Sequence, residues 1–170
     1  MNKLFTFCMF AIGLALGQVA WAQSAVTSTL AAQRVDMVDG KPVLKPAAQS
    51  KPGDIIEYSN MYKNNGTLAA EKLQATLPVP VGTTLIVGSA EPAQALASTD
   101  GVVFAPMPLM RSVRQPDGSQ RSEAVPLADY RALRWNVGTL AAGRSAVVSL
   151  RVHIDAPATA ASAAKSASKP

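Results

Sequence analysis

The single histidine of this 170-residue chain, His153, limits the chemistry that its side chains could carry out. A serine hydrolase needs a histidine to deprotonate its nucleophile, and no Gly-x-Ser-x-Gly elbow is present. The one cysteine, Cys8, lies near the amino terminus, and no Asp-x-Asp-x-Asp-Gly calcium loop occurs. His153 alternates with apolar neighbours, a pattern that places it on a solvated strand face. We therefore expect no catalytic residue, no metal and no cofactor.

Two pairs of carboxylates, Asp54 with Glu57 and Asp129 with Glu123, could act as the acid and base of a glycosidase. That reaction needs a substrate cleft, which for sugars is lined with aromatic side chains. Aromatic residues make up 5% of the chain, so solvated strand faces and turns explain these acids more simply. Carbohydrate binding or hydrolysis remains a minor alternative.

Arginines are the least ordinary polar residues, because five of them lie between Phe104 and Trp135. They are Arg111, Arg114, Arg121, Arg131 and Arg134. Guanidinium groups bind carboxylates and other anions in a bidentate fashion, so these five form the candidate site for a partner protein or an anionic glycan. The alternative is that their charge protects exposed strand edges from unwanted pairing.

The amino-terminal segment predicts export. Lys3 supplies the positive charge that precedes the apolar segment of a signal peptide, and residues 4–19 are almost wholly apolar. Ala20-Trp21-Ala22 matches a signal-peptide cleavage site. An uncleaved membrane anchor is the alternative. We expect removal of residues 1–22, Cys8 included, which leaves no disulfide and no stable membrane anchor. Residues 158–170 consist of Ala, Ser, Thr, Lys and Pro and predict a disordered tail; residues 23–157 then form one domain.

The net charge of +5 does not indicate a nucleic-acid-binding protein. Three of the 16 basic residues, Lys3, Lys165 and Lys169, lie outside residues 23–157, whereas all 11 acidic residues lie inside. The body of the protein is therefore nearly neutral, without the basic footprint that nucleic acids require.

Two alternating stretches define the elements that must position these residues. In residues 52–66, Ile56, Tyr58 and Tyr62 share one face, and in residues 135–154 the residues from Ala146 to Ile154 alternate in the same way. Each stretch predicts a strand with one buried face. Tyr58 and Trp135 are assigned to the core.

Weaker patterns predict the remaining strands. Residues 25–37 are expected to form an edge strand that ends at the Asp39-Gly40 turn. The prolines at 42, 46 and 52 then predict a connector or a further edge strand. Residues 67–77 predict a strand whose candidate core residues are Leu68, Ala70, Leu73, Ala75 and Leu77.

Turn residues divide the rest of the chain into short strands. Residues 83–87 form a β-branched run, and Asp100-Gly101 predicts a hairpin before a strand at 102–104. Residues 109–114 are expected to pair with residues 120–125 across a turn at 115–118, giving an arginine-flanked ribbon. Residues 138–143 turn the chain into the last strand. The pattern as a whole predicts an all-β antiparallel sandwich.

Both ends of this pattern resemble a known family, the bacterial immunoglobulin-like conserved repeat domain, also called domain of unknown function 11. The resemblance rests on Pro52-Gly53-Asp54-Ile55-Ile56-Glu57-Tyr58, the Asn64-Asn65-Gly66 turn, Leu77-Pro78, and the run from Trp135 to Gly143. It implies an immunoglobulin-like sandwich of about seven strands in an exported, non-enzymatic module. Three features depart from the family: Asn60 at a core-facing position, Ala75 before Leu-Pro, and the presence of one repeat.

The sequence thus predicts a monomeric, non-catalytic module of the periplasm, or a secreted one, that binds or assembles proteins of the cell envelope. A chaperone-like subunit that acts by β-strand addition is the second hypothesis. It would show a long, exposed, apolar edge strand.

Overall fold

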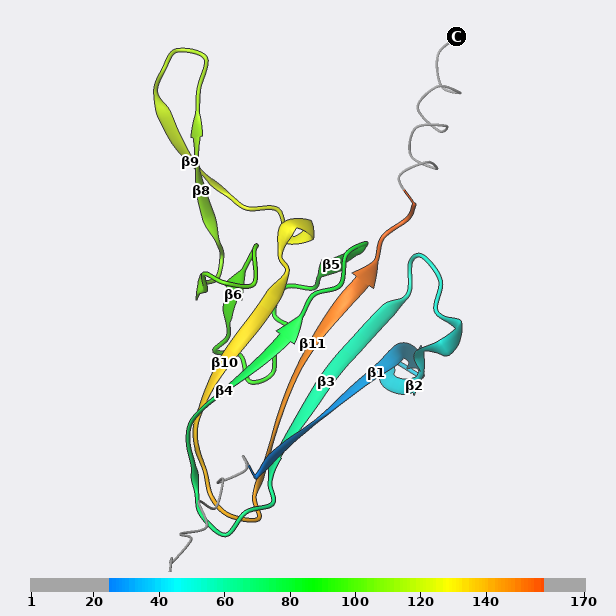
Figure 1. Cartoon of the computed structure of the whole chain (residues 1–170). Helices are drawn as coiled ribbons and strands as arrows, with labels where there is room; N and C mark the ends of the chain where they lie inside the picture. Colours follow the sequence, from blue (N-terminus) through cyan, green and yellow to red (C-terminus); the bar gives the residue numbers. More distant parts are fainter. Residues whose placement is uncertain (1–24, 158–170) are drawn as a thin grey trace, which may run out of the picture.

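The computed structural model describes residues 25–157 and shows an antiparallel β-sandwich with an inserted ribbon (Figure 1). One sheet has the order β2-β1-β3-β11-β5, with strands Lys41–Pro46, Val26–Val38, Ile55–Asn64, Ser145–Ile154 and Thr83–Leu85. The other has the order β4-β10-β6-β7, with strands Ala70–Pro78, Ala132–Leu140, Leu96–Ser98 and Ala105–Pro106. The ribbon pairs β8 (Met110–Arg114) with β9 (Gln120–Ala124). The predicted fold class is confirmed.

The two alternating stretches form the central strands of the first sheet. β3 and β11 pair so that the core-facing residues lie opposite one another: Ile56 and Val152, Tyr58 and Leu150, Asn60 and Val148. Val148, Leu150 and Val152 are buried, and each contributes about 1.5–3 kcal/mol to folding through its removal from water. This pairing confirms that each stretch has one buried face.

Trp135 lies in the core, as predicted. Its side chain is 2% exposed, and its indole N–H donates a hydrogen bond to the carbonyl of Pro92 at 2.6 Å. Tyr58 packs against the same cluster of buried residues. Both aromatic side chains therefore stabilise the sandwich, Trp135 fully buried and Tyr58 partly buried.

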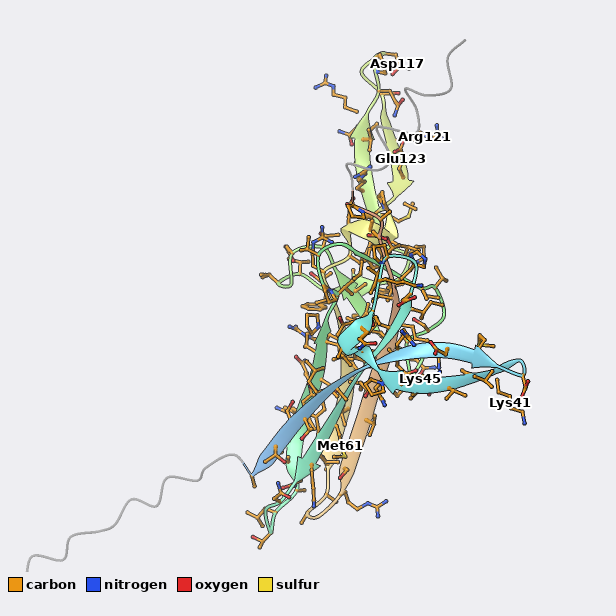
Figure 2. All side chains as sticks on the ribbon, turned by 90° about the vertical axis from the view of Figure 1, so that its right-hand side faces the viewer. Lys41, Lys45, Met61, Asp117, Arg121 and Glu123 are labelled. Atoms are coloured by element: carbon orange, nitrogen blue, oxygen red, sulfur yellow. The ribbon has the colours of Figure 1, made fainter. Side chains whose placement is uncertain are left out.

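The predicted edge strand at 25–37 lies at the edge of its sheet only over Val26–Ala32: β1 pairs with β3 on one side, and with β2 on the other side from Gln33 to Val38. Over that second half β2 forms the edge, and its prolines are tolerated there. Asp39 and Gly40 both have positive φ, as a two-residue hairpin turn requires. The resulting β1–β2 hairpin extends away from the two packed sheets, with Lys41 at its end (Figure 2).

Two expected strand assignments are wrong in detail. Leu68 is 81% exposed and precedes β4, which begins at Ala70. Val102 and Val103 lie in the loop between β6 and β7, because the carboxylate of Asp100 accepts their amide N–H groups at 2.8 and 2.9 Å. A local Asp-centred turn thus overrides the β-propensity of two valines.

The Asn64-Asn65-Gly66 turn forms without the positive φ that Asn and Gly commonly adopt in tight turns. Gly66 is required here because a Cβ would lie 2.5 Å from the Cβ of Ala25. The carboxamide of Asn64 is buried, and it donates to the carbonyls of Leu68 and Leu140 at 2.8 and 2.9 Å. Asn64 therefore joins the β3–β4 turn to the end of β10.

The last connection is also shorter than predicted. β10 continues to Leu140, and Gly138, with φ of 76°, forms a bulge at a register shift against β4. The turn proper contains Gly143, whose amide donates to the carbonyl of Asn64 at 2.8 Å. The expected signal segment and tail lie outside the described residues.

Candidate interaction surfaces

The β8–β9 ribbon is a separate two-stranded element. Its strands pair with each other and with no other strand of residues 25–157, and it extends beyond the end of the sandwich (Figure 2). Asp117 stabilises the turn at its tip by accepting the amide and hydroxyl of Ser119 at 2.9 and 2.6 Å. These hydrogen bonds, first that from the hydroxyl, lower the pKa of Asp117. The predicted ribbon is confirmed.

A buried tyrosine holds the root of the ribbon. Tyr130 is fully buried, and its hydroxyl accepts the amide N–H of Leu109 at 2.8 Å. The amide of Val125 donates to the carbonyl of Leu109 at 2.8 Å, which closes the ribbon just above the core. No local pattern in the sequence indicates this role of Tyr130, because it depends on Leu109, which is distant in the chain.

Three of the five candidate arginines lie on this ribbon and are exposed. In the β8–β9 register, Arg111 lies opposite Glu123 and Arg114 opposite Gln120, so these two arginines point to different faces. Arg121 shares the face of Arg111. A guanidinium nitrogen of Arg111 lies 3.8 Å from a carboxylate oxygen of Asp129, and both side chains are about half exposed. Such a pair contributes about 0–1 kcal/mol, so it can readily exchange for a partner's carboxylate.

The other two candidate arginines are held within the protein. Arg131 donates to the carbonyls of Ala128 and Tyr130 at 2.7 and 3.0 Å. Arg134 lies 3.7 Å from the centre of the Phe104 ring and donates to the hydroxyl of Thr76 at 3.2 Å. The structure therefore separates the five arginines into a ribbon group of three and two residues with internal contacts.

A polar network that no sequence pattern indicated links β1 and β3 of one sheet to β4 of the other. The hydroxyl of Ser28 on β1 donates to Asn60 at 2.9 Å, and the Asn60 amide donates to the hydroxyl of Tyr62 at 3.1 Å. This hydroxyl also accepts the backbone N–H of Thr76 at 3.2 Å. The network satisfies Asn60, the polar residue at a core-facing position, and occupies backbone groups at the edge of β4.

A cavity of about 310 Å³ lies at the root of the ribbon. Its walls include Leu85, Ile86, Met107, Leu127 and Tyr130, and they are almost entirely apolar. Such walls favour an apolar group over an ion.

Two of the four carboxylates considered for acid–base chemistry, those of Asp54 and Glu57, make contacts that the fold explains. Glu57 pairs with Arg151 at 2.8 Å across β3 and β11, and Asp54 accepts the amide of Lys51 at 2.9 Å. His153 is exposed, as expected. Among residues 25–157, no group of three His, Cys, Asp or Glu side chains is close enough to hold a metal ion.

A cluster of three charged side chains lies on the β1–β2 hairpin. Arg34 donates to both carboxylate oxygens of Asp36, at 2.8 and 3.1 Å, and the Lys45 ammonium lies 2.9 Å from the same group. These contacts, first that with Arg34, lower the pKa of Asp36 to about 2. They couple the two strands of a hairpin that extends into solvent.

No family model, curated protein or solved structure matches this chain. In the described part of the chain, no helix is long and apolar enough to cross a membrane.

Proposed function

We propose that this chain is an exported, non-catalytic module that binds or assembles proteins of the cell envelope, on an immunoglobulin-like sandwich of the conserved repeat family. Export rests on the sequence of residues 1–22, and the family on the two end motifs. Its localisation is periplasmic or secreted.

The projecting ribbon is the observation that carries this proposal. A solvent-exposed two-stranded ribbon gains little stability for itself, yet it places three guanidinium groups beyond the sandwich, where a second macromolecule can reach them. Arg111, Arg114 and Arg121 would bind carboxylates of an envelope protein, or an anionic glycan, through charge-assisted hydrogen bonds.

Strand addition, the second hypothesis, is supported by one observation. The first half of β1, from Val26 to Ala32, presents an exposed edge in the described part of the chain. However, this edge consists mainly of Thr, Ser and Ala, so it offers little apolar surface to an unfolded client. No specific observation favours carbohydrate hydrolysis.

The experiment replaces Arg111, Arg114 and Arg121 together with serine and tests recovery of envelope proteins by the tagged chain. We expect capture to be lost, and wild-type capture to weaken as salt rises from about 0.05 to about 0.5 M, because exposed charges are screened. The matched control replaces three exposed cations elsewhere, Lys41, Lys63 and Arg144, and should leave capture unchanged. Equal recovery by both triple variants would rule out the ribbon as the binding surface.

A further inference from the structure

On the side of β1 that faces away from β3, only the second half of the strand is paired. β2 pairs with Gln33–Val38, while along Val26–Ala32 no strand of residues 25–157 pairs on that side (Figure 1). β2 ends at Pro46, opposite Gln33, and the chain then leaves the row through the short helix η1 (Ala47–Gln49). A seven-residue segment of β1 is therefore open to a further strand.

The direction of the backbone groups along this segment follows from the β1–β3 ladder. The amide of Asn65 donates to the carbonyl of Ala25 at 2.8 Å, so the odd-numbered residues of β1 make the bonds to β3. Because bonding sides alternate along an antiparallel strand, the even-numbered residues turn their N–H and C=O groups to the open edge. These residues are Val26, Ser28, Leu30 and Ala32.

Four other strands at the edges of the two sheets are guarded against pairing. β2 carries Pro42, Pro46 and two lysines, β7 has two residues and ends at Pro106, and β5 has three residues. At the edge of β4, the hydroxyl of Tyr62 hydrogen-bonds to Thr76. Prolines, lysines, short strands and covered backbone groups are the usual means of preventing edge pairing.

The open segment of β1 has none of these guards. Val26-Thr27-Ser28-Thr29-Leu30-Ala31-Ala32 contains no charge and no proline. Leu30 lies opposite Asn60, on the side that faces the core in β3, yet 55% of its side chain is exposed. An added strand would cover this leucine as well as satisfy the backbone.

We propose that the added strand is Val26–Ala32 of a second copy, antiparallel and related by a twofold axis through Thr29. The absence of charge favours a second copy as the partner, because pairing of this segment with itself brings no like charges together. Pairing of β2 with its copy would bring lysines together, and pairing of the ribbon with its copy would bring arginines together. In this register Ser28 lies opposite Leu30 of the second copy, and Val26 opposite Ala32, so all the outward backbone groups are paired. About eight hydrogen bonds then join the chains.

The twofold axis also places the two Leu30 side chains diagonally across the new pair, within reach of each other. Because a twofold contact uses the same segment of both copies, it is complete at two copies and does not continue into a fibre. The proposal goes beyond the proposed function and does not depend on it. It replaces the monomer expected from the sequence.

Cysteine cross-linking tests the register. Thr29 and its copy form a non-hydrogen-bonded pair, whose Cα atoms lie about 4.5 Å apart, within the range that a disulfide spans. The full chain is expressed and its accumulated product oxidised; Cys8, if retained, is changed to serine. We expect Thr29→Cys to form a covalent dimer, and the exposed ribbon variant Ser122→Cys to form none beyond background. Equal cross-linking at both positions would contradict the register.

Charge substitution tests the dimer itself by light scattering. Thr29→Lys and Thr29→Glu should each be a folded monomer, because like charges meet at the axis, and a mixture of the two should form a mixed dimer. A wild-type monomer at about 100 µM, well above a micromolar dissociation constant, overturns the proposal, even if Thr29→Cys captures another protein's strand. That result would leave envelope capture by the ribbon unaffected.

Discussion

Asn64 lies where two turns of the sandwich meet, and its side chain makes three hydrogen bonds. Its amide nitrogen donates to two carbonyls, and its carbonyl oxygen accepts the amide of Gly66 at 3.0 Å. The side chain is 1% exposed, so water cannot replace these partners. Burial therefore makes this residue more important to stability than its turn preference alone indicates.

We expect Asn64→Ala to lower the free energy of unfolding by about 2–4 kcal/mol, because buried backbone groups lose their partners. The neighbouring Asn65 is the matched control: it is exposed and makes one side-chain bond, to the hydroxyl of Thr27 at 2.9 Å. Asn65→Ala should cost less than about 1 kcal/mol. Urea denaturation of both variants measures the difference, and equal losses would contradict the role given to Asn64.

Asp36 predicts a pH dependence at the β1–β2 hairpin. Its pKa is about 2 in the folded protein, against about 3.9 in an unfolded chain. The contacts with Arg34 and Lys45 therefore stabilise the folded state fully above pH about 4, and this stabilisation is lost as the pH falls through about 2. Asp36→Asn should lower the melting temperature at pH 7 but not near pH 2. A carboxyl titration by NMR with a midpoint near 4 would contradict this prediction.

Strands whose pattern is local could be predicted from the sequence. β3 and β11 follow from strict alternation, and the ribbon follows from Asp117-Gly118 between two matched runs. Features set by distant contacts could not be predicted in this way: the place of β1 inside its sheet, the exposure of Leu68, and the contact of Gly66 with Ala25.

The five candidate arginines also differ in whether local sequence could predict their surroundings. Clustering in the sequence correctly placed Arg111, Arg114 and Arg121 on one exposed element. It also included Arg131 and Arg134, which follow the ribbon in the chain but bond to backbone carbonyls, Thr76 and the Phe104 ring. Distance along the chain gave no signal that would separate the two groups.

The ribbon should be dispensable for folding. Leu109 and Val125 are a hydrogen-bonded pair, so replacing residues 110–124 by Asn-Gly closes the strands with a two-residue turn. We expect a β-sheet circular dichroism spectrum and a melting temperature within about 5 °C of wild type, because the anchoring contacts of Leu109 and Tyr130 remain. An unfolded product would show that the ribbon is part of the folding unit.

At the scale of the whole molecule, the sandwich supports two parts with different surfaces. The ribbon carries exposed positive charge at one end, and the open segment of β1 is uncharged and lies along one sheet. Different chemistry suits these surfaces to different partners: anionic groups at the ribbon, and another strand at β1. A dimer formed through β1 would present two ribbons, which strengthens binding to a partner with repeated sites.

The most direct test of the binding function measures the affinity of the folded, ribbon-deleted chain for the envelope protein that the wild type captures. We expect the dissociation constant to rise about tenfold or more, a loss of at least about 1.4 kcal/mol of binding free energy. An unchanged dissociation constant in a folded ribbon-deleted chain, or the absence of any partner for the wild type, would contradict it.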